Sequence, residues 1–421
     1  FKGFMSQRDA TIVTRLEGAG AIILAKTNMG EYASRYVGSA FGIIRNAYDT
    51  TRNPSGSSGG SASGVAANFG LVGIGEDTGG SVRGPAAVSN LVGLRPTLPL
   101  VSRFGMLPAN PTQDTMGPMT RTVADAAALL DVIAGYDPKD PVTAYAVGNI
   151  PRSYATALRA DALKEARIGV LRTPSRDTTS RGTTPRDSTP RDSTPRDSTP
   201  RDSLAGYQQV RTVIDAAIEQ LKALGASVVD SVSLPRRDQE TAMGNDYETE
   251  QATDAYFREH PNAPVKTLKE ILLSGKVNPW RARGMMPLVG KTTNDPGYQR
   301  VMQAREALRV QVLQLMADQK LDALVYATFD HPPTLIAADV LTNPRPADGY
   351  GRGDNRSLSP AIGFPALTVP AGFTPDALPV GLEFLGRPFT EELLLGFGYA
   401  FEQATHHRRS PASAPTLVGQ R

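Results

Sequence analysis

The chain has 421 residues, with 45 basic and 42 acidic side chains, so its formal net charge is only +3. This balance gives no electrostatic reason to expect a nucleic-acid or membrane partner. The sequence contains no cysteine, which excludes disulfides, thiolate metal sites and a cysteine nucleophile, and which fits a cytoplasmic location.

Apolar patterns alternate between helix-like and strand-like segments along the chain. A helix is predicted over residues 6–16, with Ser6 as its capping residue, and a buried strand over 21–25. Further strands are predicted at 71–75, 167–171, 227–229, 324–326 and 366–369, and helices at 123–135, 207–224, 300–319 and 390–404. This alternation predicts one large α/β domain whose sheet is covered by helices on both faces.

Residues 173–203 interrupt this pattern. The pentapeptide Thr-Pro-Arg-Asp-Ser occurs four times in tandem over 184–203, after a degenerate version at 173–183. Repeated proline with balanced charge cannot bury a core, so we predict a disordered loop insertion. Slippage expansion in a tolerant surface loop explains the repeats better than a docking function.

Two segments rich in serine and glycine, 56–60 (GSSGG) and 78–81 (TGGS), have the composition that acyl transfer needs. A nucleophilic hydroxyl must approach a carbonyl, and the resulting oxyanion must meet backbone N–H groups that no Cβ obstructs. The four histidines lie far along the chain from both segments, which disfavours a Ser-His-Asp triad. Ser58 formally fits a G-x-S-x-G elbow, but the polar turn at 48–54 precedes it instead of an apolar strand. A neutral lysine base with a second serine as proton carrier is the favoured alternative.

The stretch from Arg52 to Thr97 resembles the signature sequence of the amidase signature family of serine hydrolases, and the flanking segments 20–28, 113–119 and 359–365 agree. This resemblance covers essentially the whole chain except the repeats. It implies a single domain over 1–421 with a central mixed sheet, and a stand-alone amidase that hydrolyses a C–N bond in a small-molecule amide. It also implies no metal or other cofactor, no nucleic-acid or membrane partner, and action alone or as a homodimer.

Site residues follow from the resemblance position by position. Ser81 matches the nucleophile, and Ser57 matches the relay serine that follows a cis peptide bond. The implied oxyanion hole consists of Thr78, Gly79, Gly80 and Ser81. Scaffold residues beside the site are Ser58, Asp77 and Arg83, of which the last two are interpreted as an ion pair.

The base of this family is a lysine upstream of the first serine. The resemblance places it about 20 residues before Phe1, and the sequence does not begin with Met, so we expect an N-terminal segment to be missing. Lys26 is interpreted as a helix-start or scaffold residue, and Lys2 as an exposed residue near the terminus. Without its base, the chain as given would have little activity.

Two alternatives stay open. One is the A-type subunit of a glutamine-dependent tRNA amidotransferase, although residues 113–118 (QDTMGP) depart from the Leu-Asp-Gln-Ile-Gly-Pro-like stretch typical of those subunits. The other is a catalytically inactive, amidase-like binding protein, motivated by the absent lysine. Residues 140–350 are expected to form the variable helices of the substrate region, so the sequence does not identify the amide.

Overall fold

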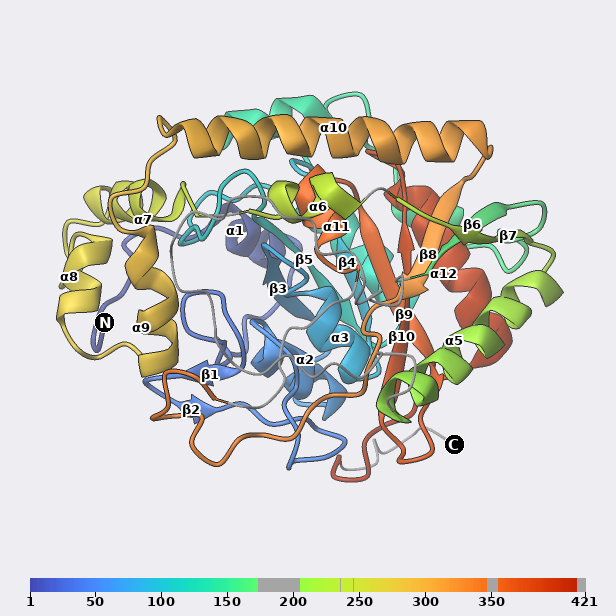
Figure 1. Ribbon diagram of the computed structural model, residues 1–421, viewed down its shortest axis with the longest axis horizontal. Helices are drawn as coiled ribbons and strands as arrows, with labels where there is room; N and C mark the ends of the chain where they lie inside the picture. Colours follow the sequence, from blue (N-terminus) through green and yellow to red (C-terminus); the bar gives the residue numbers. More distant parts are fainter. Residues whose placement is uncertain (173–204, 235, 245, 347–354, 415–421) are drawn as a thin grey trace.

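The computed structural model describes residues 1–172, 205–234, 236–244, 246–346 and 355–414 (Figure 1). The predicted insertion at 173–203 lies outside the described residues.

A mixed sheet forms the centre of the described chain, with the strand order β3-β5-β4-β9-β10-β8-β6-β7. The strands are β3 (Gly73–Asp77), β4 (Val92–Arg95), β5 (Thr115–Thr120), β6 (Arg167–Leu171), β7 (Ser227–Val232), β8 (Ala323–Ala327), β9 (Ala366–Phe373) and β10 (Pro379–Leu385). Strand β6 pairs in parallel with β7 and β8, whereas the other neighbours are antiparallel. A separate two-stranded ribbon joins β1 (Val37–Gly38) to β2 (Gly42–Ile43).

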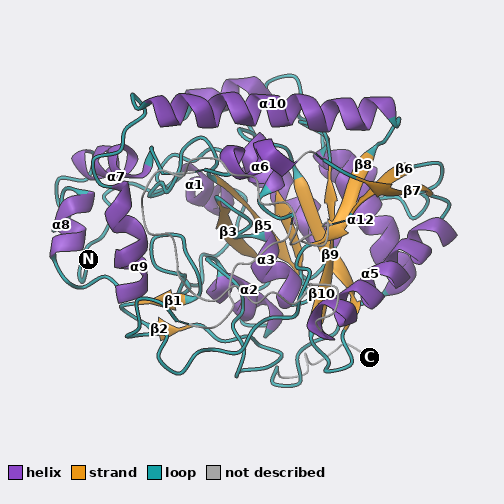
Figure 2. Ribbon diagram, in the orientation of Figure 1, coloured by secondary structure: helices purple, strands orange, loops and turns teal. Residues whose placement is uncertain are grey.

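Helices cover both faces of this sheet (Figure 2). Strand β9 shows the two faces, because Leu367 and Val369 lie against α12 whereas Thr368 lies on the side of α3. One face packs against α4 (Val123–Ile133), α5 (Ala205–Ala223) and α12 (Glu391–Thr405), and α1 (Thr11–Gly18) packs on α4. The other face packs against α2 (Gly59–Ala66), α3 (Arg83–Val88), α10 (Pro296–Asp318) and α11 (Leu358–Ile362). The single α/β domain with a covered mixed sheet is therefore confirmed.

The remaining helices lie outside these two layers. They are α6 (Arg236–Ala242), which packs on α10, and α7 (Thr249–Arg258), α8 (Leu268–Leu273) and α9 (Pro279–Met285). The last three gather at one end of the molecule, to the left in Figure 1. Short 3₁₀ turns occur at Pro141–Ala146, Tyr154–Ala157 and Met286–Leu288. No described helix is long and apolar enough to cross a membrane.

Local sequence signals explain where the long helices begin. The Thr122 hydroxyl accepts a hydrogen bond from the backbone N–H of Asp125 (3.1 Å), which caps α4 at its predicted start. Helix α10 begins with Pro296, whose missing N–H costs nothing in the first turn.

The predicted strand over 21–25 is wrong. These residues form no strand, and Ile22 and Leu24 are 89% and 72% exposed. A run of apolar residues indicates a tendency to be buried, but it does not show that a neighbouring strand is present. None of the described strands pairs with residues 21–25. The helix predicted from Ser6 begins only at Thr11, because the Ser6 side chain bonds the backbone of Arg8 in a local turn.

Candidate active site

The two serine-glycine segments lie side by side at the start of α2 and α3. The Gly56–Ser57 peptide bond is cis, and Ser57 is completely buried two residues before α2. Ser81 lies two residues before α3 and keeps 9% of its surface exposed. A hydrogen bond from the backbone N–H of Ser58 to the carbonyl oxygen of Ser81 (3.3 Å) joins the two segments.

Glycine is required where the first segment meets its neighbour. A Cβ atom on Gly56 would lie 1.5 Å from the backbone carbonyl oxygen of Arg35, so no other residue fits there without moving the main chain. Gly80 has a φ of +108°, and Gly79 faces open space, with no atom within 4 Å of the position of a Cβ. The second segment therefore presents bare backbone to its surroundings.

The amides of the second segment divide into engaged and unengaged donors. Asp77 accepts hydrogen bonds from the N–H groups of Gly80 (2.7 Å) and Val82 (3.1 Å). The N–H groups of Thr78, Gly79 and Ser81 donate to no other described residue. Of the four positions predicted for an oxyanion hole, Gly80 thus has its amide committed to Asp77.

Neither serine hydroxyl is engaged by a neighbour in the described part of the chain. The Oγ atom of Ser57 is buried without a hydrogen-bond partner there, and Ser81 Oγ forms no hydrogen bond to a described residue. Lys2 and Lys26 are both exposed, and neither is hydrogen-bonded to Ser57. A buried hydroxyl without a partner is costly, and functional sites are where such groups collect.

Ser58 has a structural task instead. Its hydroxyl donates to the carbonyl oxygen of Glu76 (3.2 Å) and accepts from the N–H of the same residue (3.1 Å). The start of α2 is therefore tied to the edge strand β3. These bonds occupy the hydroxyl, which argues against Ser58 as the nucleophile of an elbow.

A cluster of fully buried charges lies beneath the second segment. Arg83 Nε is 3.2 Å from Asp77 Oδ2, and the guanidinium of Arg83 also contacts Glu383 on β10. Arg95 Nη1 lies 3.3 Å from Asp77 Oδ1. Burial alone would raise the pKa of Asp77, but the two guanidinium groups outweigh it and lower this pKa to about 2. Asp77 is thus ionised and holds the turn through the amides that it accepts.

Sequence reasoning found the Asp77–Arg83 pair but missed two of its partners. Glu383 lies within the apolar strand β10, and Arg95 ends the apolar strand β4. A charged side chain inside an otherwise buried strand is the signal that points to such partners, because buried charges are almost always paired.

A second acidic group, also missed, surrounds Thr78. The Oγ1 atom of Thr78 is 2.6 Å from Glu76 Oε1 and 2.7 Å from Asp114 Oδ1. Asp114 directly precedes β5, and its other oxygen accepts the backbone N–H groups of Ala109 (2.8 Å) and Asn110 (2.7 Å). This contact ties the loop before β5 to the first residue of the Thr78–Ser81 turn.

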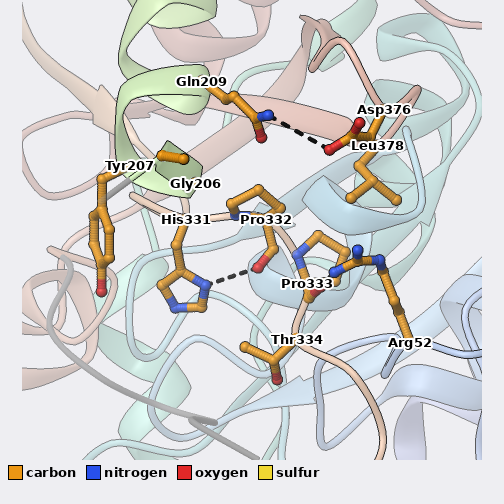
Figure 3. A pocket seen from close by; sticks show the side chains of 11 residues that line it. Arg52, Gly206, Tyr207, Gln209, His331, Pro332, Pro333, Thr334, Asp376 and Leu378 are labelled. Carbon is orange, nitrogen blue, oxygen red and sulfur yellow. Dashed lines mark hydrogen bonds between the residues drawn. The ribbon is translucent and has the colours of Figure 1, made fainter. Parts of the chain in front are cut away.

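An open cavity of about 470 Å³ lies between the start of α5 and the segment that follows β8 (Figure 3). Its lining residues are Arg52, Ala205, Gly206, Tyr207, Gln209, His331, Pro332, Pro333, Thr334, Asp376 and Leu378. Thr334 accepts hydrogen bonds from the backbone and side chain of Asn53, shortly before the first serine segment. Neither Ser57 nor Ser81 lines this cavity. Within the described ranges, no cluster of three or more His, Asp or Glu side chains has an arrangement that could hold a metal ion.

Comparison with known proteins identifies the family of this chain. The sequence pattern of the Amidase family matches residues 1–185 and 201–395. The A-type subunit of a glutamyl-tRNA(Gln) amidotransferase from Exiguobacterium sp. is 32% identical over 440 residues, covering 97% of this chain and 80% of the relative. A probable amidase of Arabidopsis thaliana is 30% identical, with 97% and 73% covered.

Solved structures show the same relationship. The native peptide amidase of Stenotrophomonas maltophilia superposes with a TM-score of 0.79 at 33% identity, covering 99% of this chain and 80% of that one. An amidase family protein of Bacillus anthracis gives 0.79 at 31% identity, with 97% and 73% covered. The chain belongs to the amidase signature family, and its reaction class is the hydrolysis of amide C–N bonds.

Proposed function

We propose that this chain is a stand-alone amidase in which Ser81 is the nucleophile and Ser57 carries the proton. The observation that carries the proposal is that the amides of Thr78, Gly79 and Ser81 itself donate to no described residue, next to the bare backbone of Gly79. The Ser58–Ser81 hydrogen bond joins this turn to the Ser57 segment. Backbone N–H groups fixed before the reaction stabilise a developing oxyanion without reorganisation.

The proposed reaction has two halves. Ser81 Oγ bonds to the amide carbonyl carbon while its proton passes to Ser57, and the oxyanion is held by the amides of Thr78, Gly79 and Ser81. Ser57 next delivers a proton to the departing ammonia or amine, which leaves an acyl-enzyme. Water then hydrolyses the Ser81 ester by the same relay in reverse.

The relay requires a base beyond Ser57. The family resemblance implies a neutral lysine amine, and the buried Oγ of Ser57 is the atom that it would contact. Neither Lys2 nor Lys26 is bonded there. Asp77 and Arg83 hold the turn and take no part in the proton transfer.

For the substrate we propose a small carboxamide such as a peptide amide. The likeness to the S. maltophilia peptide amidase over nearly the whole chain supports this class. A cytoplasmic location and the lack of a nucleic-acid partner are further proposals, supported by the absence of cysteine and the small net charge.

The test is covalent labelling of Ser81 by a serine-reactive phosphonate, together with ammonia release from a peptide amide. We expect Ser81→Ala to abolish both and Ser57→Ala to lower both by about a thousandfold. Ser63→Ala is the matched control, because this serine lies on α2 and its hydroxyl donates to the Arg45 carbonyl oxygen. Labelling that survives in Ser81→Ala would refute the assignment.

A second candidate is an A-type amidotransferase subunit, favoured by 32% identity to such a protein over 97% of the chain. It predicts that the chain co-purifies with a tRNA-binding partner and releases ammonia from glutamine only in that complex. Ammonia release from a peptide amide by the isolated chain would decide for the stand-alone enzyme.

A further inference from the structure

The group formed by Glu76, Thr78 and Asp114 cannot keep its hydrogen bonds with both carboxyl groups ionised. Thr78 Oγ1 lies within 2.7 Å of an oxygen from each, yet a hydroxyl has only one proton to donate. An ionised carboxylate only accepts hydrogen bonds. In one of the two short hydrogen bonds, the donor must therefore be a protonated carboxyl group and the acceptor the Thr78 hydroxyl.

The surroundings decide which carboxyl group carries the proton. Asp114 accepts two backbone N–H groups at its Oδ2 atom, which stabilises its charged form. Glu76 has no such donors, because its Oε2 atom is buried without a hydrogen-bond partner among the described residues. The proton therefore lies on Glu76 Oε1 and is donated to Thr78 Oγ1, while the Thr78 hydroxyl donates to Asp114.

The charges nearest to Glu76 act in the same direction. Burial raises the pKa of Glu76 well above its usual value, and the negative charges of Asp114 and Asp77 raise it further, against the opposing effect of Arg95. Burial also raises the pKa of Asp114, and the charge of Glu248 adds to this, but the hydrogen bonds from Thr78 and from the N–H groups of Asn110 and Ala109 oppose the shift. A cavity of about 160 Å³ borders Asp114 on the side of Arg103, Lys139 and Asp140, and water in it can exchange protons with the group.

We propose that neutral Glu76 is a positioning residue that fixes the Thr78–Ser81 turn through Thr78, so that Ser81 reacts only while Glu76 is protonated. This inference rests on the proposed role of Ser81. When Glu76 ionises, Thr78 can satisfy only one of its two neighbours, and the charges of Glu76, Asp114 and Asp77 repel each other. The turn then loses the anchor at its first residue, and with it the alignment of the amides next to Ser81.

Infrared spectroscopy of the whole chain tests the protonation state without any need for activity. Wild type at neutral pH should show a carbonyl band of a protonated carboxyl group that Glu76→Gln lacks. Glu402→Gln is the matched control, because it removes a half-buried carboxyl group with a raised pKa on α12, on the face of the sheet opposite α2 and α3. Spectra of wild type and Glu76→Gln that match in this region would overturn the inference. If Glu76→Gln does not fold, Thr78→Val must shift the band, because the acceptor for the Glu76 proton is gone, and an unshifted band would overturn it.

The pH profile of phosphonate labelling tests the consequence for Ser81. The wild-type rate should fall by about tenfold per pH unit above the pKa of Glu76. Glu76→Gln should lose this alkaline decline, because its amide donates to Thr78 without titrating, whereas Glu402→Gln should keep the wild-type profile. Identical profiles for wild type and Glu76→Gln would refute the positioning role. Labelling that survives in Ser81→Ala would refute the role of Ser81 instead, and the infrared result would still decide the state of Glu76.

Discussion

The backbone N–H of Ser58 donates to the carbonyl oxygen of Ser81 at 3.3 Å, so two turns separated by a helix and a strand share one hydrogen bond. The Ser58 side chain reinforces this contact by bonding both backbone groups of Glu76 on β3. The backbone position of Ser81, the proposed nucleophile, relative to Ser57, the proposed relay serine, is therefore set by one main-chain hydrogen bond and by the Ser58 hydroxyl.

The two turns differ in their tolerance of a methyl group. Gly56→Ala should destabilise the protein by about 3 kcal/mol or more, because its Cβ would overlap the carbonyl oxygen of Arg35. Gly79→Ala is the matched change, since its Cβ would meet no atom within 4 Å. We expect it to change stability by less than about 0.5 kcal/mol while lowering Ser81 labelling by about tenfold.

Urea unfolding and labelling rates measure these two effects. Equal stability of Gly56→Ala and wild type would contradict the close approach of Arg35. Full labelling of Gly79→Ala would show that the space beside Gly79 is not where the reagent binds.

Removing one of the buried charges beneath the turn should strongly destabilise the protein, because the remaining charges lose their counter-charge. Arg83→Ala leaves Asp77 and Glu383 buried without their main counter-charge, which should cost about 3–5 kcal/mol in the free energy of unfolding. Lys222→Ala breaks an exposed pair with Glu219 and should cost less than about 1 kcal/mol. Denaturant melts of both variants provide the measurement, and a loss for Arg83→Ala as small as that for Lys222→Ala would contradict the cluster.

Stability should depend on pH through Glu402. Burial raises the pKa of this carboxyl group from 4.5 to about 7, although the Val123 N–H donates to it (3.0 Å) and opposes the shift. The folded state then binds more protons than the unfolded state between these two values. The stabilisation is fully present below pH 4.5 and is lost as pH rises through 7, with a total of roughly 3 kcal/mol.

Glu402→Gln should remove this contribution, since the amide does not titrate. Thermal melts between pH 4.5 and 8 should show a smaller decline for the variant than for wild type. Parallel declines would mean that Glu402 is ionised throughout this range.

The exposed apolar run at 21–25 should promote self-association. Ile22 and Leu24 are 89% and 72% exposed, and replacing both by lysine removes no buried contact. We expect the double variant to bind less of an apolar fluorescent dye and to aggregate less at high concentration, with an unchanged melting temperature. Ile12→Lys is the contrasting change, because Ile12 is 5% exposed and should not tolerate a charge. A large loss of stability in the double variant would show that the run is packed in solution.

The sequence was sufficient for those features that short segments determine. Composition and spacing located both serine turns. The alternation of apolar segments predicted the covered sheet, because a helix or strand that buries one face has apolar residues at a regular spacing. The features that the sequence did not predict depend on residues that are distant in the sequence. The pattern at Ile22 could not reveal that no described strand pairs with this segment, and nothing in the sequence near Thr78 indicates that Asp114 is its second neighbour. Likewise, Glu383 is separated from Arg83 by 300 residues.

This last separation has a consequence for synthesis of the protein. The turn that carries Ser81 is translated about 300 residues before Glu383 of β10, which forms part of its floor, and β4 pairs with β9, which is also translated late relative to the turn. A nascent chain therefore lacks one of the two carboxylates that pair with Arg83 until β10 has left the ribosome. Hydrolytic competence should arise only after β10 has been synthesised and has joined the sheet.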